Sequence, residues 1–192
     1  MTEDLPRHAA GLSGDGSEEE WKRLFAELAR GDTDALEALY EVAARLVFGI
    51  ALWRTGSVEE AKDVVQEVFL RVARSRSRLG AVEEPRAWFL SLAHHVSVDL
   101  VRGRKRREAR SLEDVPFLIA PAGDVSREVD ARRASALLTN LPDEQREAVW
   151  LKHFGDCTFA AIGRITGVPT FTAASRYRLG VAKLRRLMEG TS

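Results

Sequence analysis

Residues 85–110 read PRAWFLSLAHHVSVDLVRGRKRREAR, and this stretch decides the fold. Apolar residues recur in it at three- and four-residue steps, which predicts a helix with one buried face. These residues are Phe89, Leu92, Val96 and Leu100. Pro85 suits the first turn, where no backbone donor is needed. The far end holds six basic residues and one acidic residue between Arg102 and Arg110. This basic end fits a nucleic-acid surface and, equally well, a solvated helix end.

The composition is that of a folded protein of one ordinary or two small domains. The chain has 192 residues, of which 45% are hydrophobic and 30% are charged. Its 29 basic and 29 acidic residues give a formal net charge of zero, which argues against indiscriminate polyanion binding. The charges are unevenly placed, however, because residues 176–186 carry five basic groups and no acid. A local patch of this kind can steer a polyanion.

Cysteine content and hydropathy indicate the compartment. The single cysteine, Cys157, excludes an intramolecular disulfide. No apolar run approaches the length of a membrane-spanning helix, and the polar, acidic N-terminus is unlike a signal peptide. We therefore expect a cytoplasmic protein without membrane insertion.

The N-terminal half predicts a helical bundle. Residues 1–17 are rich in Gly, Ser, Asp and Glu and are expected to form a flexible acidic tail. A short amphipathic helix follows and ends at Gly31. Its inward residues are Trp21, Leu24, Phe25 and Leu28. Asp32 or Thr33 can cap a second helix that runs through Arg54. Its inward residues are Leu36, Leu39, Tyr40, Ala43, Val47 and Ile50.

A third helix is predicted from the capping box of Ser57 and Glu60 to about Arg74. Its buried stripe consists of Val58, Ala61, Val65, Val68 and Val72. Its opposite face carries Asp63, Gln66, Glu67 and the apolar Leu70. By residue type alone, that face is simply solvated. A loop over residues 75–84 leads into the helix that begins at Pro85.

Helical periodicity is lost over residues 111–127, where prolines and a glycine indicate a linker between domains. Further helices are predicted over residues 129–140, 142–153, 158–166 and 170–188. The fold class is therefore all-α. We expect two small helical domains, residues 18–110 and 128–190, joined by a partly ordered linker.

A short helix, the turn Gly167-Val168-Pro169 and a longer helix are the parts of a helix-turn-helix. Such a motif presents the start of its second helix to base edges in the major groove, where arginine suits guanine and hydroxyls suit phosphate or base. The same parts also make an ordinary helical hairpin. The candidate DNA-contacting residues are Thr170, Thr172, Ala174, Ser175, Arg176, Arg178 and Lys183.

Taken in order, these segments resemble the extracytoplasmic-function class of the bacterial sigma-70 family. DVVQEVF (63–69) and the stretch from residue 85 to 107 are similar to parts of that family's region 2, and LPDEQREAV (141–149) with the following helix-turn-helix is similar to region 4. The resemblance implies an RNA polymerase sigma factor, with no cofactor and no enzymatic activity of its own. Its implied partners are core polymerase (the β′ clamp helices and the β flap), promoter DNA and an anti-sigma factor.

The resemblance also implies site residues. In this family the third helix docks on a coiled coil of the β′ subunit. The positions expected to do so here are Asp63, Val64, Gln66, Glu67, Phe69 and Leu70. The helix from Pro85 and the loop before it would bind the single-stranded minus-ten element, with a base flipped into a pocket. The positions expected to do so are Arg86, His95, Asp99, Arg102, Arg104, Lys105 and Arg106. The last helix would read the minus-thirty-five element. Trp88 could stack on a base, but we expect it in the core.

Several positions depart from the family pattern and affect the expected promoter specificity. His95 stands where asparagine is usual, and Ala161 replaces a glutamate, which removes half of a capping box. Ala173 and Ala174 replace a valine and, often, a lysine. Leu179-Gly180 stands where Arg-Ala is common, and a glycine inside a helix costs about 1 kcal/mol relative to alanine.

Other functions are less well supported. The main alternative is a stand-alone helix-turn-helix regulator of duplex DNA, and another is a module that only sequesters a protein partner. The sequence has no Gly-rich phosphate loop, HExxH motif or nucleophile elbow. His153 and Cys157 lie four apart and His94 and His95 are adjacent, but no second pair has metal spacing. We therefore predict no metal site, and we expect Cys157 to be a small buried residue.

Overall fold

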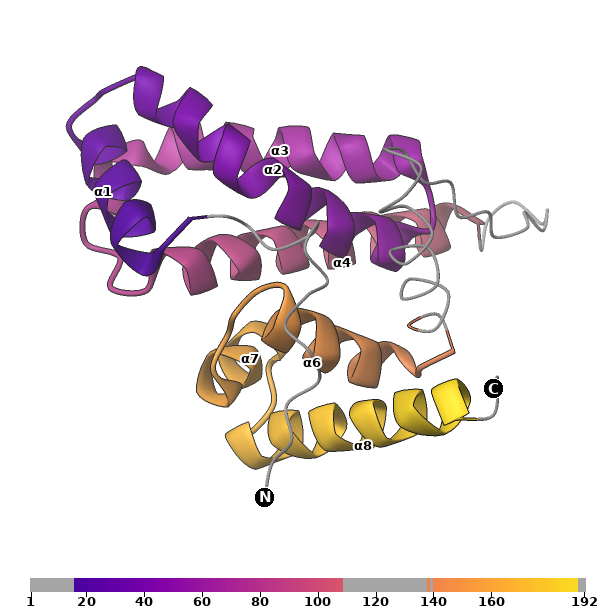
Figure 1. The fold of residues 1–192 in the computed structure, drawn as a ribbon. Coiled ribbons are helices and arrows are strands. Elements are labelled where there is room, and N and C mark those ends of the chain that lie inside the picture. Colours follow the sequence, from indigo (N-terminus) through magenta and orange to yellow (C-terminus); the bar gives the residue numbers. More distant parts are fainter. Residues whose placement is uncertain (1–15, 109–137, 139, 190–192) are drawn as a thin grey trace. The chain divides into compact units, whose positions relative to one another are not determined.

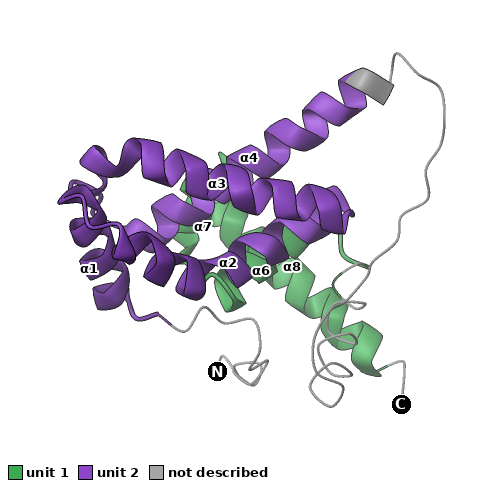
Figure 2. Cartoon of the chain, turned by 90° about the horizontal axis from the view of Figure 1, so that it is seen from above, with its two compact units in different colours: residues 1–13, 121–192 green, residues 14–120 purple. Residues whose placement is uncertain are grey.

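The computed structural model describes residues 16–108, 138 and 140–189, and within them the chain is all-α, as predicted (Figure 1). The chain divides into two compact units (Figure 2). Residues 14–120 contain α1 to α4, and the unit that includes residues 121–192 contains α6 to α8. Residues 1–15 of the tail predicted over 1–17, the linker over residues 111–127 and most of the helix predicted over 129–140 lie outside the described residues. Ser17, the last residue of that predicted tail, is described and caps α1.

The first unit is a bundle in which α2, α3 and α4 pack against one another and α1 packs on all three (Figure 1). These helices are α1 (Glu18–Ala29), α2 (Asp34–Thr55), α3 (Val58–Leu79) and α4 (Pro85–Glu108). The Asp32 carboxylate accepts the Asp34 N–H at 3.0 Å at the start of α2. The Ser57 hydroxyl accepts the Glu60 N–H at 3.3 Å and caps α3, which is one half of the predicted capping box. The Ser57 N–H donates to the Thr55 hydroxyl at 3.2 Å rather than to Glu60. Side-chain acceptors of this kind satisfy amides that the first turn leaves without partners.

An aromatic cluster fills the centre of this unit. The Trp21 ring centroid lies 6.2 Å from that of Phe25 and 5.3 Å from that of Phe89. Phe69 adds a further contact, with its centroid 5.4 Å from that of Phe89. Trp88 packs edge-on against Phe25 at 5.8 Å. The core interpretation of Trp88 therefore fits the structure better than a base-stacking role.

Two details of the first unit differ from the predictions. Helix α3 continues to Leu79 rather than ending near Arg74, because the polar run after Arg74 leads to a leucine that is buried in the core. Tyr40, predicted to point inward, is 52% exposed. Its ring centroid lies 4.9 Å from that of Phe69, so the tyrosine covers the core from outside.

The buried face of α4 is also rotated from the predicted stripe. Leu92 and Leu100 are only half-buried. The fully buried side chains are Phe89, Leu90, Ala93, Val96 and Ser97. Small residues allow the neighbouring helices to approach this face, and the Ser97 hydroxyl donates to the Ala93 carbonyl at 2.7 Å, so its burial leaves no donor unsatisfied.

The second unit contains the predicted helix-turn-helix. Its helices are α6 (Asp143–His153), α7 (Phe159–Thr166) and α8 (Thr170–Glu189). The turn after α7 is tight, since Gly167 has φ of 70° and a Cβ on Gly163 would lie 2.7 Å from the Val168 carbonyl oxygen. Only glycine fits both positions without strain. The Tyr177 hydroxyl lies 3.1 Å from His153 Nε2 and joins α8 to the end of α6.

Some predictions about composition can also be compared with the structure. Among the described helices, none combines the length and the apolarity that a membrane crossing requires. Cys157 is buried, and α6 ends at His153, so these two residues do not share one helix face. Thr158 accepts the Ala161 N–H at 3.1 Å, and Ala161 is itself buried. Because Ala161 has no carboxylate, only the bond from its N–H to the Thr158 hydroxyl caps this helix, as expected.

Candidate nucleic-acid and protein interface

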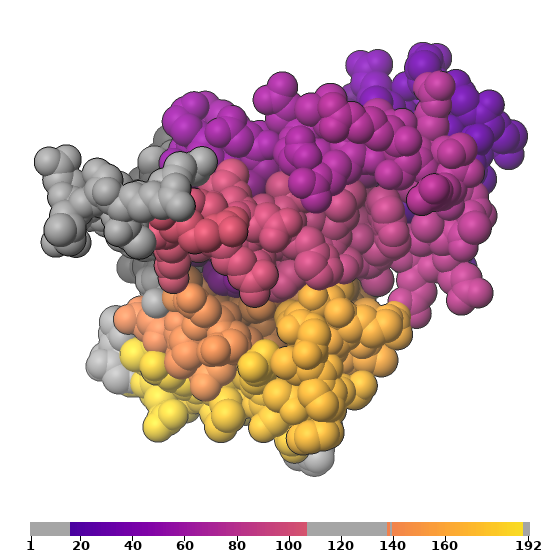
Figure 3. Space-filling model, turned by 180° about the vertical axis from the view of Figure 1, so that it is seen from behind, coloured from indigo at the N-terminus to yellow at the C-terminus, as the bar shows by residue number. Residues whose placement is uncertain are grey.

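The basic end of α4 presents cations to solvent. Arg102, Lys105 and Arg106 are exposed, and the last turns of α4 lie at the surface (pink-red in Figure 3). His95 and Asp99 are exposed nearer the middle of the same helix. Side chains with exposed positive charge can follow a phosphate backbone and attract it without reading its sequence.

Arg104 differs from these neighbours, because its guanidinium is held inside the first unit. Its Nη1 donates to a Glu60 carboxylate oxygen at 2.8 Å and to the Thr55 carbonyl oxygen at 3.0 Å. Glu60 lies in the first turn of α3 and Thr55 is the last residue of α2. Arg104 therefore joins the end of α4 to the corner between α2 and α3. A cation at a helix C-terminus and an acid at a helix N-terminus both suit the helix dipoles.

Arg86, at the start of α4, also faces its own unit. It is half-buried. Partial burial raises the pKa of the Glu18 carboxyl, and the nearby cations of Lys22 and Arg86 oppose that shift. Of the predicted minus-ten residues, Arg86 and Arg104 thus have partners within the unit, whereas the other five are exposed.

His95 has a defined ring orientation although it is exposed. Its Nδ1 lies 2.6 Å from the Ser91 carbonyl oxygen. A carbonyl oxygen can only accept, so Nδ1 carries the proton in this arrangement. The His94 ring packs edge-on beside it at 5.3 Å. In the neutral imidazole, Nε2 is then a hydrogen-bond acceptor, whereas the asparagine usual in the family offers both a donor and an acceptor.

The outer face of α3 borders an open groove of about 590 Å³ along α4. Asp63 and Gln66 are exposed, Leu70 is 44% exposed, and Glu67 pairs with Arg71 at 2.6 Å. The α4 side of the groove is formed by Val96, Asp99, Leu100 and Gly103. Three carboxylates beside apolar residues make this groove suited to a partner helix that carries basic and apolar side chains.

Two residues expected on that face lie elsewhere. Val64 is 0% exposed and Phe69 is 8% exposed, and Phe69 packs on Phe89. Their side chains belong to the core, because the family motif that includes them spans almost two helical turns and so covers both faces. Val64 and Phe69 are thus core residues, and of the residues expected to dock, Asp63, Gln66, Glu67 and Leu70 remain accessible at the surface.

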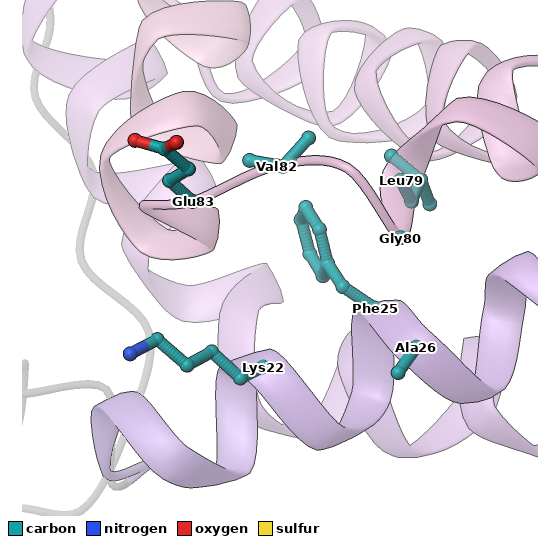
Figure 4. A pocket seen from close by; sticks show the side chains of 7 residues that line it. All are labelled: Lys22, Phe25, Ala26, Leu79, Gly80, Val82 and Glu83. Atoms are coloured by element: carbon teal, nitrogen blue, oxygen red, sulfur yellow. The ribbon is translucent and has the colours of Figure 1, made fainter.

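The loop before α4 borders a second, smaller cavity of about 240 Å³ (Figure 4). The Phe25 ring stands under the loop at Val82, and Leu79 closes one end. The polar ends of Lys22 and Glu83 lie at the opposite end (Figure 4). Phe25 and Leu79 are each only 1% exposed, so the accessible lining comes mainly from the exposed Lys22, Gly80 and Glu83.

On α8, the predicted DNA-contacting residues lie along the first turns of the helix. Thr170 and Arg178 are exposed, and the others are half-buried. Those others are Thr172, Ala174, Ser175, Arg176 and Lys183. Two large apolar side chains are exposed on the same helix, since Phe171 is 74% exposed and Leu179 is 56% exposed. Phe171 was missed by the sequence reading, although its place in the first turn of the recognition helix was a usable signal.

Gly180 has a packing role that the sequence did not reveal. It is buried, and a Cβ added there would lie 2.8 Å from Val149 Cγ2 and 3.2 Å from the Gln145 carbonyl oxygen. Both neighbours belong to α6. Helices α6 and α8 therefore approach most closely at this glycine, and the absence of a side chain is what permits the contact.

Comparison with protein families gives two matches. Residues 39–107 match the model described as "Sigma-70 region 2", and residues 131–184 match "Sigma-70, region 4". Curated relatives are named ECF RNA polymerase sigma factor SigK. The protein of Mycobacterium ulcerans is 28% identical over 187 residues, which is 92% of this chain and 97% of the relative. That of Mycolicibacterium vanbaalenii is 27% identical over 171 residues, which is 86% of this chain and 87% of the relative.

Solved structures share the fold. CnrH, in a complex with the cytosolic domain of CnrY, has a TM-score of 0.61 and 21% identity, over 90% of this chain and 99% of CnrH. The sigma factor RpoE, in a complex with the anti-sigma factor NepR from Bartonella quintana, has a TM-score of 0.64 and 19% identity, over 80% of this chain and 96% of RpoE.

Proposed function

Because the chain belongs to the sigma-70 family, as an RNA polymerase sigma factor of the ECF type, we propose how its two units divide the work of promoter recognition. Residues 18–110 dock on core polymerase and hold the melted minus-ten element. Residues 128–190 bind the minus-thirty-five element as duplex, and residues 111–127 link the two domains. The chain contributes binding and positioning, and no chemical step of its own.

Docking on polymerase uses the outer face of α3. The face has exposed Asp63 and Gln66 beside a half-exposed Leu70, and an open groove of about 590 Å³ lies next to it. The β′ clamp helices of core polymerase are the proposed occupant. Polar groups at the rim would fix the register of the two helices, and burial of Leu70 would add hydrophobic stabilisation.

Strand separation uses α4 and the loop before it. Exposed Arg102, Lys105 and Arg106 provide a path for phosphates. We place a flipped base at the loop that borders the smaller cavity, where the exposed Glu83 lies near the base edge. The Phe25 ring below it is 1% exposed and stays in the core. The single observation that carries the assignment is the order of surfaces along one chain: a helix that exposes Asp63 and Gln66, then a helix with a basic end, then a helix-turn-helix.

Two further protein contacts are proposed, one with core polymerase and one with a separate protein. The β flap is proposed to hold the second unit. An anti-sigma factor is a further proposed partner, supported by the structural neighbours CnrH and RpoE, both seen in complexes with another protein. Core polymerase and promoter DNA are both proposed partners, so a cytoplasmic location is proposed as well.

The test is transcription in vitro with purified core polymerase and a library of genomic fragments. The full chain should direct initiation from a defined subset of fragments, and core polymerase alone should not. A stand-alone regulator would instead footprint duplex DNA tightly without polymerase. Tight, site-specific footprints of the free chain, together with no polymerase-dependent initiation, would show that the proposal is wrong.

A further inference from the structure

The first turn of α8 carries an aromatic side chain that nothing in the fold explains. Phe171 is 74% exposed, the largest exposed fraction among the large hydrophobic side chains of the described residues. Residues on the inner side of the same helix are tightly packed, with Ala173 at 0% exposed. An exposed phenylalanine contributes little to folding, since the benefit of an aromatic side chain comes from its burial.

Helix geometry fixes the direction in which Phe171 points. Each residue turns an α-helix by about 100°, so Phe171 and Ala173 are about 200° apart and lie on opposite sides of α8. Ser175 and Arg178, four and seven residues later, fall within about 40° of Phe171 on the outward side. Phe171 therefore shares a face with two of the residues proposed to contact DNA.

The face of α8 around Phe171 has few side chains that could form hydrogen bonds with DNA bases. Ala174 offers no hydrogen bond, and Leu179 is an exposed apolar residue. The N-terminal end of a recognition helix is the part that reaches base edges in the major groove. In that groove the C5-methyl group of thymine is the one apolar feature that distinguishes a base pair, and an aromatic side chain can contact it.

We propose that Phe171 is a specificity-determining residue that packs against the C5-methyl group of a thymine in the minus-thirty-five element. The proposal rests on the proposed role of the second unit in binding that element. Arg178 and Ser175 then position the helix on phosphate or base, and Phe171 supplies sequence discrimination without a hydrogen bond. Leu179 lies about 12 Å further along the helix and is not required for this contact.

Uracil provides an atom-level test, because it differs from thymine only by the methyl group. Full-length chain with core polymerase is used to select binding sites from duplex DNA with a randomised upstream element. Each thymine of the selected element is then replaced by uracil. A buried methyl group is worth about 0.8 kcal/mol, so wild-type holoenzyme should lose about fourfold in affinity at one thymine position.

Two substitutions distinguish a specific role of Phe171 from a general change in DNA binding. Phe171→Ala should bind the thymine and uracil duplexes equally, whereas Leu179→Ala, the control on the same helix, should keep the fourfold discrimination. Circular dichroism should show unchanged folding for both, because both side chains are exposed. The proposal is overturned if wild type does not distinguish uracil from thymine at any position, or if Phe171→Ala still does.

The same selection distinguishes the proposed role of the second unit from that of Phe171. If no upstream element is enriched, the proposed role of the second unit fails, and the role of Phe171 fails with it. If an element is enriched but is insensitive to uracil or contains no thymine, only the role of Phe171 fails. Phe171 would then be assigned to a protein surface rather than to DNA.

Discussion

Replacement of Arg104 by alanine tests whether this residue contacts DNA or positions those that do. In the structure its guanidinium bridges the last turns of α4 to Glu60 at 2.8 Å and to the Thr55 carbonyl oxygen at 3.0 Å. We expect Arg104→Ala to destabilise the first unit and to misplace the end of α4. We do not expect it to remove a phosphate contact, although its residue type and neighbours suggest one.

The expected loss of stability in Arg104→Ala can be estimated from how exposed the Arg104–Glu60 ion pair is. The Arg104 and Glu60 side chains are 32% and 24% exposed, so water screens their ion pair only in part. A partly exposed pair contributes up to about 1 kcal/mol, and the bond to a carbonyl oxygen adds about 1 kcal/mol more. Arg104→Ala should therefore lower the free energy of unfolding by roughly 1–2 kcal/mol. For a unit of this size, each 1 kcal/mol lowers Tm by about 4–8 °C.

The assay measures both stability and salt dependence. A double-mutant cycle that combines Arg104→Ala with Glu60→Gln should give an interaction energy of about 0.5–1 kcal/mol between the two side chains in thermal unfolding. The salt slope of open-complex formation should be unchanged in Arg104→Ala. In Lys105→Ala and Arg106→Ala, the matched controls, it should fall by about 0.7 each, the value for a phosphate contact on single-stranded DNA. If Arg104→Ala reduces the slope as these controls do, without a loss of Tm, the bridge has no structural role and Arg104 contacts DNA.

Three further predictions concern the other surfaces. Asp63→Ala with Gln66→Ala should weaken binding to core polymerase at least tenfold with unchanged Tm, measured by fluorescence anisotropy; unchanged affinity would remove the docking face. Gly180→Ala should destabilise the second unit by roughly 1 kcal/mol, because a clash costing about 1–3 kcal/mol outweighs a gain of about 1 kcal/mol in helix propensity. Gly103→Ala, where a Cβ would meet nothing within 4 Å, should instead stabilise the first unit, and calorimetry that finds the same sign for both would contradict the packing argument. Glu83→Ala should reduce the fluorescence rise of 2-aminopurine in the non-template strand on melting; an undiminished rise at every position would move the flipped base away from this cavity.

Most of the fold was predictable because its signals are local. Ser57 and Thr158 cap helices where a hydroxyl precedes an apolar periodic run, and Gly56 and Gly167 end helices in the left-handed conformation. The prediction of the end of α3 failed where polar residues interrupt the local pattern. Helix α3 extends to Leu79, which continues the seven-residue spacing of Val58, Val65 and Val72, but the polar residues 74–78 in between led to the prediction of a loop.

For the candidate residues, the exposure of several side chains was predictable from the sequence, whereas the partners of others were not. Exposure of Arg102, Lys105 and Arg106 follows from helical spacing. The partner of Arg104 does not, since Glu60 lies 44 residues away in the chain. A motif quoted as a continuous run, such as residues 63–69, also merges the two faces of its helix. The assignment of Val64 and Phe69 to the surface failed for that reason.

Helix α8 shows why departures from a family pattern have to be examined one by one. Gly180 and Leu179 are adjacent, and from sequence both count as losses on a DNA-binding helix. They face different surroundings, because successive residues of a helix are turned by about 100°. Gly180 is buried against α6 and allows the two helices to approach, so it maintains the fold that presents the helix. Leu179 and Phe171 are exposed and leave that fold unaffected, so these two positions are free to change what the helix recognises.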